Sequence, residues 1–390
     1  MNLLKISIAY LLHYKLQTAL SMIILAFGII IITLLLLVNE QVKTAMEKNI
    51  SEVDMVIGAK GSPLQFILSS LFHIDFPTGN ISMEDADFIA GHRLVKNAIP
   101  VSIGDSYEGF RIIGTDTGYY GLFDLEIAEG TYPHSTLEVI AGQGAAQKLQ
   151  LKTGDTFTSS HGFSDDGGHG EFHFKITGIL KPTGRIQDDL LFTPLASYWE
   201  VHETDTSNLF ITNLLLQFRN PMAAVQLPRL VNNTSNLQAA MPAFEVSRLL
   251  SMLGAGAKFL NLLAFLMVGI AVMSIFITMF TTLNQRRYDM AIFRTMGATK
   301  KKQFLFILFE GIIISFSGTI SGIAISHLIL WVINFSFEGN TGLMLSGEIF
   351  NVKELYILAL GTATGIAGAI IPAVSIYRTD ISKILSESQS

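Results

Sequence analysis

The densest group of side chains that could do chemistry lies between residues 161 and 173, where three histidines and three carboxylates occur among thirteen residues. Imidazole and carboxylate groups are ligands that Zn²⁺ and related divalent ions bind, and the glycines between them would let the chain fold these groups together. The pattern H-E-x-x-H is absent, so hydrolysis at this loop is not expected, and a solvated hairpin loop explains the same composition. The metal hypothesis assigns a zinc or other divalent ion to His161, Asp165, His169, Glu171 and His173.

The composition excludes several other chemistries. The chain has no cysteine, which rules out thiol nucleophiles, iron-sulfur clusters and disulfides. The phosphate-binding pattern G-x-x-x-x-G-K-[ST] is also absent, and residues 58–62 resemble it only superficially. We therefore expect a chain that is not an enzyme and binds no nucleotide cofactor. Its net charge of -6, with basic residues near the edges of apolar segments, argues against nucleic acid as a partner.

The elements that must position these residues are dominated by long apolar segments. The chain of 390 residues is 49% hydrophobic and only 15% charged, with a mean hydropathy of +0.45. A helix needs roughly 20 apolar residues to cross the hydrocarbon core of a bilayer. Four segments meet that length, at 18–38, 259–283, 304–335 and 355–376, which predicts four transmembrane helices in contact with membrane lipid.

Lysine and arginine near the ends of these segments predict their orientation. Basic residues precede the first segment, crowd the loop 284–303 and follow the fourth in the tail 377–390, so these parts should be cytoplasmic. Both termini would then be cytoplasmic, with 39–258 a single extracytoplasmic insertion and 336–354 a short extracytoplasmic loop. Residues 1–38 would hold the first transmembrane helix, retained and not cleaved as a signal peptide. Its first 15 residues suit an amphipathic helix in the inner leaflet or an extension of that helix.

The inserted region has about 220 residues of ordinary polarity, enough to bury its own core. Short β-like segments are expected at 54–58, 109–114, 137–141, 172–180, 190–193 and 208–218. Helices are expected at 83–92, capped by Ser82, at 221–238 and at 244–253. The predicted fold is a membrane α-helical protein with a large α+β domain between transmembrane helices 1 and 2. Gly254 and Gly256 suggest either a hinge below this domain or a tolerated helix junction.

A motif in the loop after the second apolar segment identifies a family. Residues 286–299 read RRYDMAIFRTMGAT, which resembles the RREIGILRALGAT signature of ABC transporter permeases of the MacB, LolE and FtsX type. Asp289 and Ala291 depart from the usual Glu and Gly. The resemblance continues through Glu310-Gly311 and the glycines of the last two apolar segments. It implies a coupling helix that sits in a groove of a cytoplasmic ATPase, with contact or capping roles for Arg286, Arg287, Asp289, Arg294 and Gly297.

The resemblance also implies partners and a location. An ABC ATPase on a separate chain would bind ATP and Mg²⁺, and two permeases, identical or homologous, would dock onto it in a bacterial inner membrane. The ectodomain would be periplasmic and would move a periplasmic cargo or lipoprotein by mechanotransmission. Two alternatives remain: a signalling subunit that resembles FtsX and activates a cell-wall hydrolase, and a metal-binding envelope sensor or enzyme.

Small and ionisable residues inside the apolar segments predict further contacts. Gly318 with Gly322, and Gly361 with Gly365, have the spacing that lets helices approach closely. We expect one pair to pack within the chain and the other to form a dimer contact. His327 should form a hydrogen bond to a neighbouring helix, and Glu310 should reach interfacial water or a basic loop residue.

Overall fold

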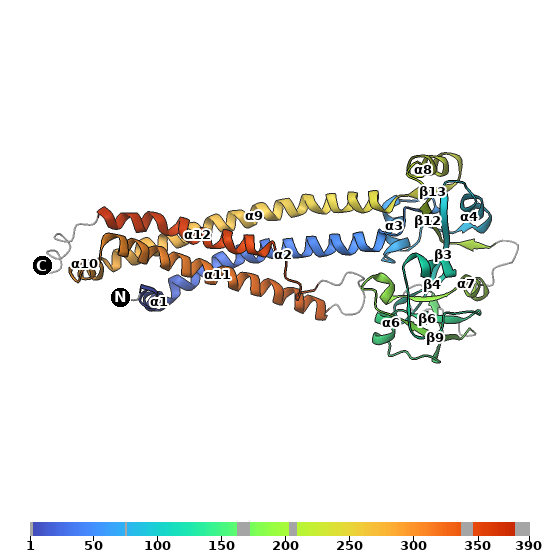
Figure 1. The fold of residues 1–390 in the computed structure, drawn as a ribbon, viewed down its shortest axis with the longest axis horizontal. Helices are drawn as coiled ribbons and strands as arrows, with labels where there is room; N and C mark the ends of the chain where they lie inside the picture. The colour runs from blue at the N-terminus through green and yellow to red at the C-terminus, as the bar shows by residue number, and fades with distance from the viewer. Residues whose placement is uncertain (1–2, 75, 162–171, 203–208, 337–345, 379–390) are drawn as a thin grey trace. The chain divides into compact units, whose positions relative to one another are not determined.

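The structure of the chain is a computed structural model, and it divides into two compact units (Figure 1). The described residues are 3–74, 76–161, 172–202, 209–336 and 346–378. The helical unit contains the described residues up to Gln41, together with Leu253–Ser336 and 346–378. The α/β unit contains the described residues of Val42–Met252.

Four helices of the described chain are long and apolar enough to cross a membrane. They are α2 (Lys15–Ile50), α9 (Pro242–Gln285), α11 (Lys300–Ser336) and α12 (Glu354–Ser375). Each contains one of the four predicted apolar segments. The helices α2 and α9 continue past these segments, and each contributes residues to both units. At Gly254 and Gly256 α9 is unbroken, so the glycines are tolerated within a continuous helix.

Three shorter elements complete the helical unit. The first residues form a separate helix, α1 (Leu3–His13), that a turn at Tyr14 divides from α2. Its apolar side chains Ile6, Tyr10 and Leu11 pack against a buried cluster that includes residues of α11. The other two elements are α10 (Arg287–Thr295) and the 3-10 helix η2 (Ile376–Arg378).

The glycine pairs of α11 and α12 lie where helices of the same chain approach most closely. A Cβ atom at Gly322 would lie 2.9 Å from Ile29 of α2, and one at Gly361 would lie 2.0 Å from the hydroxyl of Thr319. Gly318 faces Met22, and Gly365 faces Ser315 and the backbone of Gly311. Both pairs therefore pack within the chain. Neither pair is left open in the described helices, so neither is free there to form the dimer contact that we expected of one of them.

A hydrogen-bond network joins α11 to the start of α12. His327 on α11 contacts the carbonyl oxygen of Gly347 through Nδ1 at 2.7 Å and a carboxylate oxygen of Glu354 through Nε2 at 2.9 Å. The side chain of Glu354 is fully buried and also accepts a bond from the backbone N–H of Asn351. Beside this network, the amide of Gln41 makes two hydrogen bonds with the backbone of Ser346. The predicted bond from His327 to a neighbouring helix is thus present.

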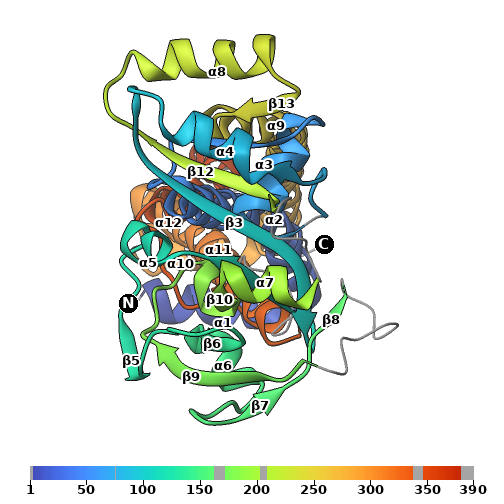
Figure 2. The same ribbon diagram turned by 90° about the vertical axis from the view of Figure 1, so that its right-hand side faces the viewer.

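The α/β unit is built on a mixed sheet whose strand order is β13-β1-β12-β3-β4-β10-β6-β9-β5, with β7 on β9 and β8 on β3 (Figure 2). The β4–β10 and β6–β9 pairs are parallel, and the other pairs of this sheet are antiparallel. The strands are β1 (Met55–Ala59), β3 (Val95–Tyr107), β4 (Phe110–Thr115), β5 (Ile127–Gly130), β6 (Glu138–Ala141), β7 (Thr156–Phe157), β8 (Ser160–His161), β9 (Phe174–Leu180), β10 (Leu191–Pro194), β12 (Asn213–Phe218) and β13 (Leu237–Ala240). A separate two-stranded sheet pairs β2 (Ile81–Ser82) with β11 (Phe210–Ile211).

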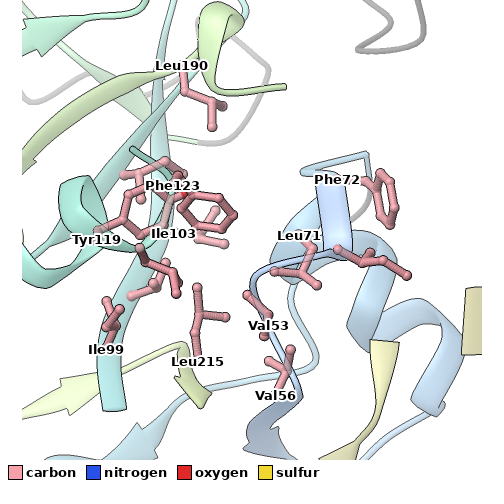
Figure 3. Packing of buried hydrophobic residues seen from close by; sticks show 14 of the residues in the cluster. Val53, Val56, Leu71, Phe72, Ile99, Ile103, Tyr119, Phe123, Leu190 and Leu215 are labelled. Carbon is pink, nitrogen blue, oxygen red and sulfur yellow. The ribbon is translucent and has the colours of Figure 1, made fainter. Parts of the chain in front are cut away.

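Short helices cover this sheet: α3 (Pro63–Leu71), α4 (Met83–Ala90), α5 (Thr117–Leu122), α6 (Gln143–Lys148), α7 (Leu195–Val201), α8 (Ala223–Thr234) and the 3-10 helix η1 (Ile186–Asp189). The predicted cap of α4 is confirmed, because the Ser82 hydroxyl accepts a hydrogen bond from the backbone N–H of Asp85. Figure 3 shows the largest buried cluster, in which Val53, Leu71, Ile99 and Leu215 come from segments distant in sequence.

The predicted mixture of strands and helices is confirmed, but several details differ. The strands β2, β3, β5, β7, β8 and β13 and the short helices α3, α5, α6 and α7 were not predicted. The expected helix 221–238 ends at Thr234, where the chain turns into β13. The expected strand 208–218 is divided between β11 and β12.

A buried histidine makes the stability of the α/β unit depend on pH. Burial of His73, and then the positive charge of Arg111, lowers the pKa of this imidazole from 6.5 to about 3. Above pH 6.5 the imidazole is neutral in the folded and unfolded chains, so its contribution to stability is complete. Below pH 6.5 only the unfolded chain takes up the proton, and the free energy of unfolding should fall by up to about 1.4 kcal/mol per pH unit.

We expect His73→Asn to flatten this pH dependence in chemical unfolding measured between pH 7 and pH 4.5, because asparagine tolerates the positive φ of 53° here and does not titrate. The same exchange at the exposed His134 is the matched control. An unchanged slope in the His73 variant would contradict the assignment.

Candidate coupling site

The family motif forms a short helix, α10, between two membrane-spanning helices. Its apolar face is buried through Met290 and Ala291. Its C-terminal end is closed by Gly297, which adopts a φ of 92° that favours glycine. The backbone N–H of Ala298 then bonds the carbonyl of Phe293 at 2.9 Å, which satisfies one of the last carbonyls of the helix. The predicted capping position of Gly297 therefore has a direct structural reason.

A buried ion pair lies at the start of this helix. The two terminal nitrogens of Arg286 bond the two carboxylate oxygens of Glu310 on α11, each at 2.8 Å. Both side chains are buried, with 3% and 1% of their surfaces exposed. The Arg286 Nε also donates to the carbonyl of Thr282 on α9. Bidentate geometry with further hydrogen bonds is the arrangement that makes a buried ion pair tolerable.

An aromatic residue of α1 contacts both Arg286 and Asp289. The guanidinium of Arg286 lies 4.5 Å from the ring centre of Tyr10, within the range of a cation–π contact. The Tyr10 hydroxyl donates to a carboxylate oxygen of Asp289 at 3.1 Å. Burial, and then the negative charge of Asp289, raises the pKa of Tyr10, so the phenol stays protonated and remains a donor. Together, Arg286 and Tyr10 connect α1, α9, α10 and α11.

A second contact fixes the middle of α10. The side-chain amide of Gln303, at the start of α11, donates to the carbonyl of Met290 at 2.6 Å. Gln303 is buried, so the bond is shielded from water. Position and orientation of α10 are thus set from both of its flanking helices.

The outer face of α10 presents different chemistry. Arg287 is exposed, Tyr288 is 47% exposed, and Met296, just after the helix, is 77% exposed. Arg294 is half-buried. A short helix with a basic and partly apolar outer face can donate charge-assisted hydrogen bonds to acidic groups of another protein.

The five predicted coupling residues therefore occupy four kinds of position. Arg287 lies on the outer face, Asp289 and Arg294 are half-buried, Arg286 is buried, and Gly297 ends the helix. Arg286, for which the resemblance implied a contact or capping role, is buried and points to Glu310. Glu310 thus reaches a basic loop residue, one of the two partners expected for it. Tyr10 and Gln303 were not predicted.

The predicted metal ligands fall mostly outside the described residues, which exclude Asp165, His169 and Glu171. For His161 only the backbone, in β8, is described, and His173 lies exposed just before β9. Among the side chains that the structure does describe, no group of three or more His, Asp and Glu is placed to hold a metal ion.

Comparison with known proteins agrees with this architecture. Residues 18–231 match the model of the MacB-like periplasmic core domain, and residues 261–381 match that of the FtsX-like permease C-terminal region. Neither description includes an ATP-binding domain. Comparison with curated protein sequences gives no significant match.

Two solved structures resemble the chain at low identity. The periplasmic region of MacB from Actinobacillus actinomycetemcomitans is 11% identical, with a TM-score of 0.36, over 52% of this chain and 97% of that one. The extracellular domain of the noncanonic ABC-type transporter YknZ from Gram-positive bacteria is 14% identical, with a TM-score of 0.33, over 47% of this chain and 98% of that one.

The first family model alone covers more than half of the chain, and the second covers most of α9 together with α10, α11 and α12. Four apolar helices and this membership indicate a membrane protein with a periplasmic domain, and the family implies an ATPase partner. The chain belongs to the family of MacB/FtsX-type ABC transporter permeases.

Proposed function

We propose that the chain couples ATP hydrolysis by a separate cytoplasmic ABC ATPase to movement of its periplasmic domain, and that α10 is the helix that docks in the ATPase. The observation that carries this proposal is the division of α10 into an outer face with Arg287 exposed and an inner side held by buried polar bonds. In this proposal Arg286 does not touch the ATPase and instead positions the helix that does.

The buried contacts explain how a push on α10 would reach the long helices. Arg286 bonds α9 and α11, and Asp289 bonds Tyr10 of α1, so displacement of α10 must carry these helices with it or break buried polar bonds. Breaking such a bond without water to replace it is costly. The unbroken helices α2 and α9, which contribute to both units, would carry the motion onward.

The remaining parts of the proposal follow from charge and from the family. Lys300, Lys301 and Lys302 join the arginines of α10 on one side of the membrane, which should be cytoplasmic. Two permease subunits would dock onto an ATPase dimer that binds ATP and Mg²⁺. The work done would be export of a cargo or transfer of a periplasmic substrate or lipoprotein.

Affinity purification of the tagged chain in mild detergent tests the proposal directly. We expect an ABC ATPase to co-purify, and the ATP turnover of that ATPase to change when the permease is reconstituted with it. Reproducible absence of an ATPase from the purified material would contradict the proposed function.

Charge reversal on α10 should uncouple the two proteins. With Arg294→Glu we expect normal membrane insertion but at least about a tenfold weaker association with the ATPase, because one opposite-charge contact becomes a like-charge contact. The measurement is ATPase stimulation as a function of permease concentration in proteoliposomes. The same reversal at the exposed Lys96 of the α/β unit is the control. Equal stimulation by the wild type and the Arg294 variant would count against α10 as the coupling helix.

A further inference from the structure

The segment 346–353, directly before α12, is held on the helical unit by hydrogen bonds. The side-chain amide of Gln41 on α2 donates to the carbonyl oxygen of Ser346 at 2.9 Å and accepts a bond from the Ser346 N–H at 2.7 Å. His327 of α11 bonds the carbonyl oxygen of Gly347. A Cβ atom at Gly347 would lie 2.5 Å from the backbone oxygen of His327, so the segment lies directly on α11. Contacts with two long helices thus fix its position.

Two membrane-spanning helices mark the level of this segment in the bilayer. On α2 the predicted apolar segment 18–38 ends just before Gln41. The helix α12 begins at Glu354, and its 22 residues are about 33 Å long, close to the roughly 30 Å of a hydrocarbon core. The segment 346–353 therefore lies where the hydrocarbon core meets the headgroups, on the side of the membrane where α2 leads into the α/β unit.

The side chains of the segment are arranged as on a surface that contacts lipid. Ile349, Phe350 and Val352 are 55%, 59% and 70% exposed. Asn351, which lies among them, is half-buried, and its backbone N–H bonds the carboxylate of Glu354. A segment in water would gain by turning its apolar side chains inward, because burial of apolar surface is favourable there. Apolar side chains outside and polar groups inside suit an apolar solvent.

The backbone of the segment is also prepared for a site with little water. Four of its N–H groups bond side-chain oxygens of the helical unit, at Ser346, Glu348, Asn351 and Lys353. Non-helical backbone at membrane depth needs such protein partners. The exposed charged residues Glu348 and Lys353 lie on either side of the apolar ones, and Lys353 is paired with Glu40 of α2.

Exposed aromatic residues of α11 and α12 lie at the same end of the helical unit. His327 bonds Glu354, so α12 begins beside this part of α11, and α11 continues past that level (Figure 1). On the continuing part, Trp331 and Phe335 are stacked and are 50% and 66% exposed. Tyr356, in the first turn of α12, is 75% exposed. Tryptophan and tyrosine are enriched where membrane meets water, so the lipid-facing surface of both helices reaches this level.

We propose that the segment 346–353 is an interfacial anchor that inserts Ile349, Phe350 and Val352 among the acyl chains of the periplasmic leaflet. Phospholipid is the partner, because the segment continues the lipid-facing surface of two spanning helices. Lys353 is engaged by Glu40, so the contact depends on acyl chains and not on headgroup charge. The sequence predicts an extracytoplasmic loop at 336–354, and the proposal places the described part of that loop in the membrane. This contact is separate from ATPase coupling.

Site-directed spin labelling tests the proposal, because the chain has no cysteine and a single one can be introduced anywhere. The full chain is reconstituted in phosphatidylcholine vesicles with a nitroxide on Phe350→Cys. Collisions are measured with oxygen, which dissolves in acyl chains, and with a water-soluble nickel chelate. The matched controls are Phe265→Cys, 55% exposed in the apolar part of α9, and Phe88→Cys, 80% exposed on α4 of the α/β unit.

We expect high oxygen accessibility at position 350, as at 265, and nickel accessibility at least about tenfold lower than at 88, since hydrocarbon excludes polar solutes. Gel filtration checks folding, and Val352→Cys provides a second position. The result should be the same when phosphatidylglycerol is added to the vesicles.

Three outcomes would overturn the proposal. Nickel accessibility at positions 350 and 352 equal to that at 88 would place the segment in water. Low accessibility to both reagents would show that protein covers it. Protection from nickel only in vesicles with phosphatidylglycerol would show that headgroup charge, and not acyl chains, holds it. Each of these outcomes leaves the proposed function untouched, because no ATPase is present in the experiment.

Discussion

Replacing Arg286 by alanine should destabilise the helical unit by about 3–5 kcal/mol, because the change leaves the Glu310 carboxylate buried without its partner. The carboxylate must then ionise without a counter-ion, take up a proton, or draw water into the helix packing. In each case the bond that ties the start of α10 to α11 is lost. The measurement is the thermal unfolding midpoint of the purified chain in detergent, with ATPase stimulation as a second readout.

The neighbouring residue provides the matched control. Arg287→Ala removes the same side chain from an exposed position and should change the unfolding midpoint little. Replacing both members of the pair, with Arg286→Met and Glu310→Leu, should recover much of the lost stability, since no buried charge is left unpaired. Equal shifts of the unfolding midpoint in Arg286→Ala and Arg287→Ala would show that the ion pair does not stabilise this unit.

Gly365→Ala is expected to cost about 1–3 kcal/mol by forcing α11 and α12 apart. A Cβ atom at this position would lie 2.1 Å from the Ser315 hydroxyl and 2.3 Å from the carbonyl oxygen of Gly311. The serine side chain can rotate away, but the carbonyl belongs to the backbone of α11, so the helix itself must shift. The unfolding midpoint of the full chain measures the cost.

Gly269→Ala makes the same change in another membrane-spanning helix, α9, where a Cβ atom would meet nothing within 4 Å. Because alanine favours helix over glycine, this control should be neutral or slightly stabilising. If both variants unfolded at the same temperature, close α11–α12 packing at Gly365 would not be limiting for stability.

The four long helices could be predicted because each satisfies its own backbone hydrogen bonds, so its signal lies within one stretch of sequence. The strand β3 could not. It contains Pro100, and its residues from Ile99 to Ile103 are all buried, so it lacks the alternation of a strand with one exposed face. Its partner β4 follows directly after a tight turn, but its other partner, β12, comes from a distant part of the chain. The end of α8 was misplaced for a similar reason, since β13 is defined by pairing with β1.

The coupling helix was predictable from its motif. That Arg286 is buried while Arg287 is exposed was not predicted. Helical spacing puts Arg286 on the same face as Met290 and Phe293, whereas Arg287 falls outside this face. That spacing, together with a glutamate inside an apolar segment, was a sufficient signal for the Arg286–Glu310 pair. The contact of Tyr10 carried no such signal, because it depends on how α1 packs against α11.

The hydrogen bonds of His327 determine the total charge of the network at the start of α12. A carbonyl oxygen has no proton, so the Nδ1 that contacts Gly347 must be the donor. The bond from Nε2 to Glu354 then needs one more proton, which either the imidazole or the carboxyl group can hold. In the first case a cation faces an anion, and in the second two neutral groups face each other. Either way the sum is zero, so this membrane segment can hold an ionisable pair without placing a net charge among its apolar helices.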